Sequence, residues 1–323
     1  MRKYSESSGL EPLPFGERLE RGFASFPSKL LLFGEYGLMF DAMALSIPFP
    51  RFSGFLDFDN GLFHQESSAE IRKFSEHLNT GVAYQKLHFP FDLERLKDDL
   101  RKDLYFNSNI PQQYGVGSSG ALVAALFSEY ADVSVAEDKL VPEILKADFA
   151  VLESYFHGRS SGLDPLISFL NQALLIDSKK TIQTVHPDLA QTGLSVALID
   201  TKTTGATGPL VQHFIDQLNF PEFKLAFETQ FIPANNGCIE SLLHHDKIEF
   251  FSFLQKLIQF HLQHFHRMIP GDFHAIISQA LNEKVFIKLL GSGGGGFLLA
   301  FAESEDILLK WSDRHGIDLL KVV

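Results

Sequence analysis

A glycine-rich segment in the middle of the chain runs directly into a stretch that is apolar on every side. Gly115, Gly117 and Gly120 fit the spacing G-x-G-x-x-G, and residues 118–130 have the pattern of a helix. A helix that is apolar all round has to be buried, so this stretch predicts a core element. Glycines let the backbone approach a phosphate closely, and the helix N-terminus behind them offers free N–H groups. The segment therefore predicts a phosphate-binding loop.

The spacing alone leaves other interpretations of this loop open. A dinucleotide-binding loop has the same spacing, but its helix leads to a second parallel strand, whereas here a second helical stretch follows from about residue 139. The phosphate loop of ATPases needs a lysine after its last glycine, and no lysine follows Gly120 directly. A turn that only allows two helices to pack closely is the remaining alternative.

Two carboxylates lie on either side of a connection rich in glycine and serine. Glu153 falls near the end of one expected helix, and Asp164 falls at the start of the next, directly before Pro165. Taken separately, they are typical of a solvated helix face and of a helix cap. Taken together in one cleft, one could hold Mg²⁺ and the other could accept a proton from a substrate hydroxyl. Phosphoryl transfer needs these parts in addition to a phosphate loop.

Bulk properties restrict the partners and the location of the chain. The net charge of −12 argues against a nucleic-acid partner, which favours a basic surface. The sequence has no apolar run of about 18 residues and no apolar signal core, so we expect neither a membrane span nor secretion. A disulfide within the chain would need a second cysteine beside Cys238, so the reducing cytoplasm fits the composition.

The apolar periodicity predicts a mixture of strands and helices, and hence the α+β class. Strands are expected at 22–26, 29–33, within 43–65, and at 105–110, 193–200, 285–290 and 297–301. Helices are expected at 89–104, 118–130, 139–156, from 163 onward and within 239–268. Residues 1–20 have the composition of a polar lead-in. We place a domain boundary near residue 190, between Pro187 and Gly193.

Three stretches have an order and spacing that resemble the superfamily of galactokinase, homoserine kinase, mevalonate kinase and phosphomevalonate kinase, the GHMP kinases. They are Lys29–Gly37 (KLLLFGEYG), Pro111–Gly120 (PQQYGVGSSG) and Gly291–Gly296 (GSGGGG). The resemblance implies a two-domain α+β fold with the active site between the domains. Residues 1–190 would form the N-terminal ATP-binding kinase domain, which is ribosomal protein S5 domain 2-like. Residues 191–323 would form a ferredoxin-like C-terminal domain.

The resemblance also implies catalytic roles for individual residues. ATP would bind on the loop formed by Gly115, Val116, Gly117, Ser118, Ser119 and Gly120. Ser119 and Glu153 would bind Mg²⁺, and Asp164 would be the catalytic base or would orient the attacking hydroxyl. Lys29 would sit beside Asp164 and steady the charge on the transferring phosphoryl group. The segment 291–296 would be a turn between two strands that packs against the phosphate loop.

The substrate is a small-molecule alcohol in this resemblance, and the substrate-site positions are Glu35, Tyr36, His157 and Thr207. The segment from His157 to Asp164 is similar to the mevalonate kinase pattern H-G-x-x-S-G-x-D. The predicted function is therefore phosphorylation of the primary hydroxyl of mevalonate, a step of isoprenoid biosynthesis. A homodimer is compatible with the resemblance.

One departure keeps other functions open. Mevalonate kinases commonly have G-E-H in the first stretch, whereas this chain has Gly34-Glu35-Tyr36, which is more similar to phosphomevalonate kinases. A phosphomevalonate, sugar or homoserine kinase is therefore an alternative. A non-catalytic member that senses a nucleotide or metabolite is another. The histidines His261, His264 and His266 fit a core-facing helix better than a metal site, and Cys238 fits a structural role.

Overall fold

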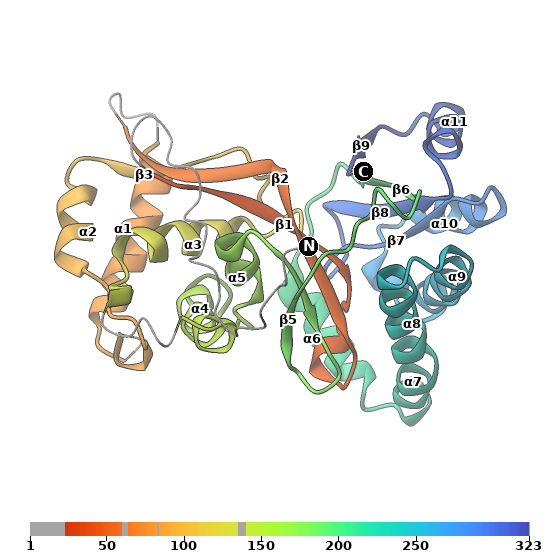
Figure 1. Cartoon of the computed structure of the whole chain (residues 1–323), viewed down its shortest axis with the longest axis horizontal. Helices are drawn as coiled ribbons and strands as arrows, with labels where there is room; N and C mark the ends of the chain where they lie inside the picture. Colours follow the sequence, from red (N-terminus) through yellow and green to blue (C-terminus); the bar gives the residue numbers. More distant parts are fainter. Residues whose placement is uncertain (1–22, 60–63, 83, 135–139, 323) are drawn as a thin grey trace, which may run out of the picture. The chain divides into compact units, whose positions relative to one another are not determined.

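The structure is a computed structural model that describes residues 23–59, 64–82, 84–134 and 140–322 (Figure 1). The expected polar lead-in at residues 1–20 lies outside the described residues. The chain forms two compact units, each built from three segments. The first unit contains the described residues up to Pro27, Ser53–Asn109 and Ser119–Asn171, and the second unit contains the rest. This grouping crosses the boundary expected near residue 190, and that boundary stays a prediction.

The first unit is mainly helical. Its elements are β3 (Leu104–Ser108) and the helices α1 (Gln65–Asn79), α2 (Leu93–Leu100), α3 (Ser118–Tyr130), α4 (Pro142–His157) and α5 (Leu163–Leu170), with the short helix η2 (Tyr84–Lys86). The second half of β2 (Ala44–Phe58) pairs antiparallel with β3, as Figure 1 shows. In α3 every residue from Gly120 to Phe127 is buried, which confirms the buried helix predicted from its apolar sequence.

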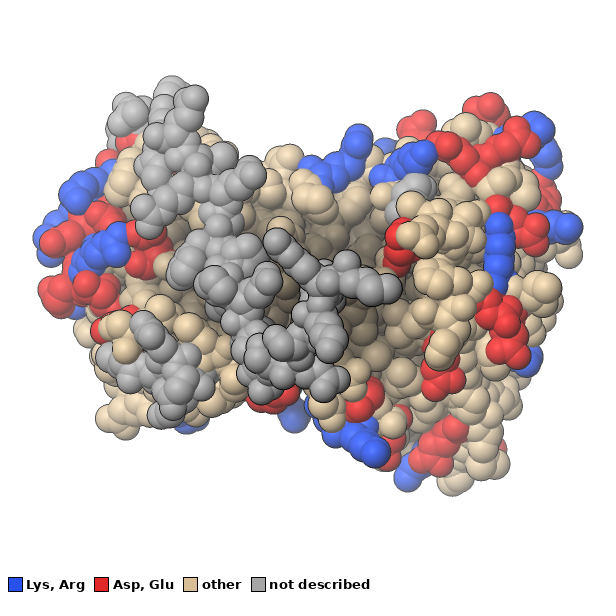
Figure 2. All heavy atoms as spheres, in the orientation of Figure 1, with Lys and Arg blue, Asp and Glu red and all other residues tan. Residues whose placement is uncertain are grey.

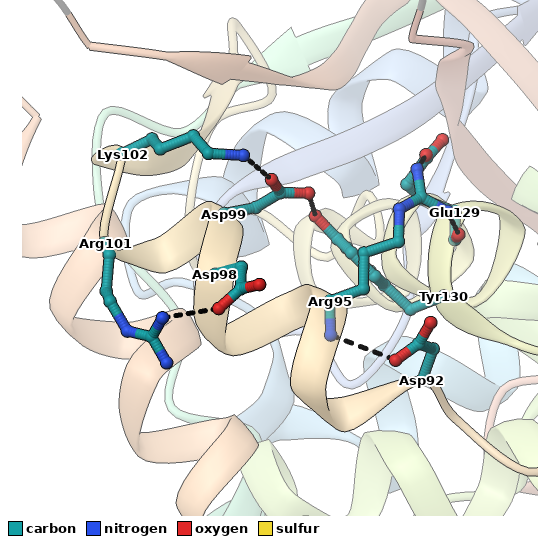
Figure 3. Close-up of polar contacts among 8 residues, drawn as sticks. All are labelled: Asp92, Arg95, Asp98, Asp99, Arg101, Lys102, Glu129 and Tyr130. Carbon is teal, nitrogen blue, oxygen red and sulfur yellow. Dashed lines mark hydrogen bonds and ion pairs between the residues drawn. The ribbon is translucent and has the colours of Figure 1, made fainter.

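Helix α2 is shorter than the helix expected at 89–104 because Asp92 caps it. The Asp92 side chain accepts a hydrogen bond from the backbone N–H of Arg95 at 3.0 Å. Near the C-terminal end of the helix, Asp99 accepts hydrogen bonds from the hydroxyl of Tyr130, at 3.1 Å, and from Lys102, at 2.9 Å (Figure 3). Burial, reinforced by the Asp99 charge, raises the pKa of Tyr130. These contacts fasten α2 to the C-terminal end of α3.

The second unit contains most of β1 (Ser25–Phe33) and the first half of β2, beside β4 (Ala173–Ile176) and β5 (Ile182–Val185). Residues 43–65 were expected to form several strands, but β2 is one strand of 15 residues. A second sheet has the order β7-β8-β6-β9 and is antiparallel throughout. Its strands are β6 (Ser195–Asp200), β7 (Phe286–Leu289), β8 (Phe297–Ala302) and β9 (Leu319–Lys321). All residues of β7 and β8 are buried, although β7 lies at the edge of the sheet.

The helices of the second unit are more numerous than the sequence pattern predicted. They are α6 (Thr207–Gln217), α7 (Pro221–Ala226), α8 (Ile232–Leu243), α9 (Lys247–His264), α10 (Phe273–Asn282) and α11 (Glu305–His315), with the short segments η1 (Gly37–Met39), η4 (Phe227–Phe231) and η5 (His266–Met268). Helices α9 and α10 pack on β7, and α11 packs on β8 and β6. The helical stretch expected within 239–268 is broken at His244–Asp246, because Asp246 caps α9 by accepting from the N–H of Glu249.

Phenylalanine fills much of the interior of the second unit. The chain has 32 phenylalanines, and a cluster of them packs ring on ring between the helices. The fully buried members of this cluster are Phe214, Phe227, Phe231 and Phe265. Phe227 and Phe231 stack with ring centroids 4.5 Å apart. The high phenylalanine content is therefore explained by core packing.

Acidic and basic side chains are interspersed on the face of the molecule that Figure 2 shows. Several pair along a single helix, such as Lys97 with Glu94 on α2 and Lys310 with Asp306 on α11. These pairs are largely exposed to solvent and contribute little to stability.

Both units combine helices with antiparallel strands, which confirms the predicted α+β class. The assignment of the two expected domains to S5-like and ferredoxin-like folds stays a prediction. Across the described ranges, every helix is too short or too polar to cross a membrane.

Candidate active site

In the first unit, a serine hydroxyl and a buried carboxylate meet where the glycine-rich loop ends. Ser119 lies in the first turn of α3, and its Oγ donates to Oε1 of Glu153 at 3.0 Å. Glu153 comes from α4 and is only 4% exposed, so the interpretation as a solvated helix residue is wrong. Its other oxygen accepts a hydrogen bond from Ser160. Nε2 of His157, an exposed residue at the end of α4, lies 2.8 Å from the same Ser119 Oγ.

Asp164 lies in the first turn of α5, as the sequence predicted. The N-cap of this helix is Gly162, which has a left-handed φ of 74°, so Asp164 is not the cap. The starts of α3 and α5 are in close contact at Gly120. A Cβ atom at Gly120 would lie 2.8 Å from the carbonyl carbon and 2.9 Å from Cβ of Asp164. The close approach of the two helices therefore places Asp164 beside the residue that follows Ser119.

The donor atoms of Ser119 and Glu153 fit a magnesium ion. Mg²⁺ prefers hard oxygen ligands, and it is commonly bound through one or two protein groups together with substrate phosphates and water. A hydroxyl and a carboxylate in contact match this description. Within the described residues, no three or more His, Cys, Asp or Glu side chains form a metal-binding group, so a cage made only of protein ligands does not occur there.

In the second unit, the predicted phosphate loop has the backbone that its glycines allow. Gly115 and Gly117 have left-handed φ values of 76° and 80°, which a residue with a side chain rarely adopts. Between them, Val116 is buried, and its carbonyl accepts a hydrogen bond from the backbone N–H of Lys29 at 2.9 Å. Lys29 lies on β1 and is 6% exposed. The loop is thus held by the strand that carries the predicted catalytic lysine.

The segment Gly291–Gly296 forms the expected turn between β7 and β8. A Cβ atom at Gly296 would lie 2.6 Å from Cα of Tyr114, just before the phosphate loop. The N–H of Gly205 donates to the carbonyl of Gln113 at 3.2 Å. The expected packing of the glycine-rich turn against the phosphate loop is therefore observed within the second unit.

Three of the predicted substrate positions lie beside this turn. Glu35 is 2% exposed, and its carboxylate pairs with Lys288 of β7. Burial raises the pKa of Glu35, while the charges of Lys288 and Lys29 act in the opposite direction. The hydroxyl of Tyr36 donates to the carbonyl of Ser292 at 2.7 Å. The hydroxyl of Ser292 donates to that of Thr207, an exposed residue, at 3.1 Å.

The structure thus groups the predicted site residues in two sets. Ser119, Glu153, His157 and Asp164 lie in the first unit, and Lys29, Glu35, Tyr36, Thr207 and residues 115–118 lie in the second. Sequence reasoning missed Ser160, Lys288 and Ser292. The signal for Lys288 is a single charge inside the apolar run Val285–Leu290, which predicts a buried partner of opposite charge.

Comparisons with known proteins show which family model and which folds this chain resembles. Residues 82–172 match the family model described as the GHMP kinases N terminal domain. The structure is similar to that of L. major mevalonate kinase in complex with R-mevalonate, with 19% identity, a TM-score of 0.62, and 93% and 94% of the two chains covered. No curated protein matches the chain by sequence.

Two further solved structures share the fold. The first is Streptococcus pneumoniae phosphomevalonate kinase in complex with phosphomevalonate and AMPPNP, with 15% identity, a TM-score of 0.62 and 92% and 98% coverage. The second is Lactococcus lactis galactokinase complexed with galactose, with 11% identity, a TM-score of 0.63 and 92% coverage of both chains. At these identities the likeness shows a common fold.

Residues 82–172 thus match the N-terminal domain model of the GHMP kinases, and the chain shares its fold with solved members of that superfamily. Members of this superfamily are kinases that use ATP as the phosphate donor.

Proposed function

We propose that this protein is an ATP- and Mg²⁺-dependent kinase that phosphorylates the primary hydroxyl of mevalonate. The observation that carries the proposal is the contact between Ser119 and Glu153, with Asp164 packed against the neighbouring Gly120. Metal-binding oxygens and a second carboxylate, next to a glycine-rich loop, are the groups that phosphoryl transfer requires.

The phosphates of ATP would bind on the loop from Gly115 to Ser118. Its glycines leave the backbone accessible, and the first turn of α3 presents N–H groups without partners inside the helix. Ser119 and Glu153 would hold Mg²⁺, which neutralises charge on the phosphates. The hydrogen bond from Ser160 keeps the Glu153 carboxylate oriented for this role.

Asp164 would accept a hydrogen bond or a proton from the acceptor hydroxyl and so point its oxygen at the phosphoryl group. Lys29 would stabilise the negative charge that develops as this group is transferred. Holding the reacting groups in place accounts for most of the catalysis in this reaction class, because the protein has little covalent chemistry to perform.

Mevalonate is supported as the acceptor by the segment from His157 to Asp164, which fits the mevalonate kinase pattern and contains Asp164 itself. Phosphomevalonate is the second candidate, and Tyr36 favours it. The Tyr36 ring lies 4.6 Å from that of Phe214, and its hydroxyl is engaged by Ser292.

An acceptor panel tests the proposal. ADP release would be measured with ATP and Mg²⁺ in the presence of mevalonate, phosphomevalonate, homoserine or galactose. The proposal predicts the highest kcat/KM with mevalonate. Turnover with phosphomevalonate alone would move the assignment to the second candidate, and binding of ATP without turnover of any alcohol would indicate a sensor.

A further inference from the structure

A buried ion pair in the second unit joins the first of the family-like stretches to β7, the strand that leads into the third. Nζ of Lys288 contacts Oε1 of Glu35, and both side chains are completely shielded from solvent. The same Nζ donates to the carbonyl of Leu289 at 2.6 Å and lies 5.3 Å from the centroid of the Phe33 ring. Burial of such a pair is costly, and a pair of apolar residues often gives equal or better stability. Its presence therefore calls for a reason other than stability.

The pair reaches the predicted catalytic lysine through Glu35. Glu35 lies two residues beyond the end of β1, the strand that carries Lys29, so its pairing with Lys288 anchors that end of the strand. Burial raises the pKa of Glu35, and the charges of Lys288 and Lys29 oppose this rise. Lys29 is in turn tied to the phosphate loop through the carbonyl of Val116. Displacing Glu35 would therefore change the electrostatic field around Lys29. It would also shift the C-terminal end of β1, the strand on which Lys29 lies.

The pair also fixes the glycine-rich turn. Lys288 lies three residues before Gly291, and the neighbour of Glu35, Tyr36, holds the carbonyl of Ser292. Two consecutive residues, 35 and 36, thus contact the strand that leads into this turn and the second residue of the turn. Because Gly296 of the turn packs closely against Tyr114, a shift of the turn would reach the phosphate loop.

We propose that Lys288 is a positioning residue for phosphoryl transfer, which acts through its ion pair with Glu35 to hold Lys29 and the Gly291–Gly296 turn in place. The inference rests on the proposed kinase function and refines one part of it. Glu35 then serves inside the protein and does not bind the acceptor. This assignment replaces the substrate role that the sequence suggested for Glu35.

The test compares Glu35→Met, Lys288→Met and the double variant. Each single variant leaves one buried charge without its partner and should be strongly destabilised, whereas the double variant removes both charges and should recover a melting temperature near that of the wild type. A positioning role predicts that the double variant, although stable, has a kcat lowered by about 100-fold with its acceptor KM within about threefold of the wild type. Lys310→Met removes a lysine from an exposed pair on α11 and is the matched control, with unchanged kcat.

Wild-type kinetics in the double variant would show that the pair is only structural and would overturn the inference. If the double variant does not fold, the kinetics of the nearly isosteric Glu35→Gln variant distinguish a positioning role from an acceptor-binding role. A lower kcat at unchanged acceptor KM supports positioning, and a higher acceptor KM at unchanged kcat assigns Glu35 to the acceptor site.

A binding measurement separates this inference from the proposed function. If the wild type phosphorylates no alcohol, the proposed function fails. The inference is then tested by the affinity for a fluorescent ATP analogue with Mg²⁺. It predicts weaker binding by the double variant than by the wild type or Lys310→Met, and equal binding would contradict it.

Discussion

The hydroxyl of Ser119 donates to the carboxylate of Glu153 across 3.0 Å, and this contact joins the first turn of α3 to the last turns of α4. The second oxygen of Glu153 accepts a hydrogen bond from Ser160, in the connection to α5. The carboxylate is therefore held from two sides by hydroxyl groups. If Glu153 binds Mg²⁺ as proposed, these contacts would fix its orientation before the metal binds.

Replacing Glu153 by Gln should raise the Mg²⁺ concentration required for activity. The amide keeps the size of the side chain but removes the negative charge that attracts the ion. We expect the half-saturating Mg²⁺ concentration to rise by about 10-fold or more. A magnesium titration of turnover at saturating ATP measures this change. Glu143→Gln, at an exposed position of the same helix, is the control, and an equal Mg²⁺ requirement in both variants would exclude Glu153 as a ligand.

Replacing Gly120 by Ala should separate the starts of α3 and α5. The added Cβ would lie within 2.9 Å of backbone and side-chain atoms of Asp164, which cannot yield without moving the helix. Overpacking of this kind costs about 1–3 kcal/mol, which urea unfolding would detect. Gly208→Ala on α6 is the control, because open space surrounds Gly208, and it should unfold at the same or a higher urea concentration. Equal stability of Gly120→Ala and the wild type would contradict the observed packing.

The buried His261 should make the protein less stable in mild acid. Burial, together with the charge of Lys288, holds the pKa of His261 well below its ordinary value of 6.5. The unfolded chain therefore binds a proton below pH 6.5 that the folded chain does not bind, so stability is lost as the pH falls below this value. The contribution is up to about 1.4 kcal/mol per pH unit. Urea unfolding at several pH values should show a shallower loss in His261→Leu, and identical slopes would refute the prediction.

Removing the hydroxyl of Tyr36 should loosen the glycine-rich turn. Tyr36→Phe leaves the carbonyl of Ser292 without the donor that now lies 2.7 Å away, and the expected loss of stability is about 1 kcal/mol. Tyr84→Phe changes a residue outside this contact and should have a smaller effect. The free energies of unfolding of the two variants test this prediction. Equal values would mean that the Tyr36 hydroxyl does not contribute to stability.

Much of the first unit could be predicted because its signals are local. The apolar residues of α3, and Gly162 before α5 with Pro165 in its first turn, specify these helices within a few neighbours, and both begin where the sequence indicated. The turn between β7 and β8 was predictable for the same reason, since a run of glycines separates two apolar segments.

The partners of buried charges could not be predicted from local patterns. Glu35 and Lys288 are 253 residues apart, and only the pairing of distant strands and turns brings them together. The length of β2 was missed because Pro48 and Pro50 suggested breaks, yet both lie within the strand. Helices α6, α7, α10 and α11 were not predicted from the sequence pattern.

The most direct test of the central claim is the Asp164→Asn variant. The amide keeps the shape of the side chain but cannot accept a proton, so turnover with mevalonate should fall by about 10²–10⁴-fold. ATP and Mg²⁺ should bind as they do to the wild type, because their predicted ligands are Ser119, Glu153 and the loop. Asp98→Asn, on the exposed side of α2, should keep full activity. Full turnover in Asp164→Asn would contradict the account, since phosphoryl transfer would then not depend on the carboxylate at the start of α5.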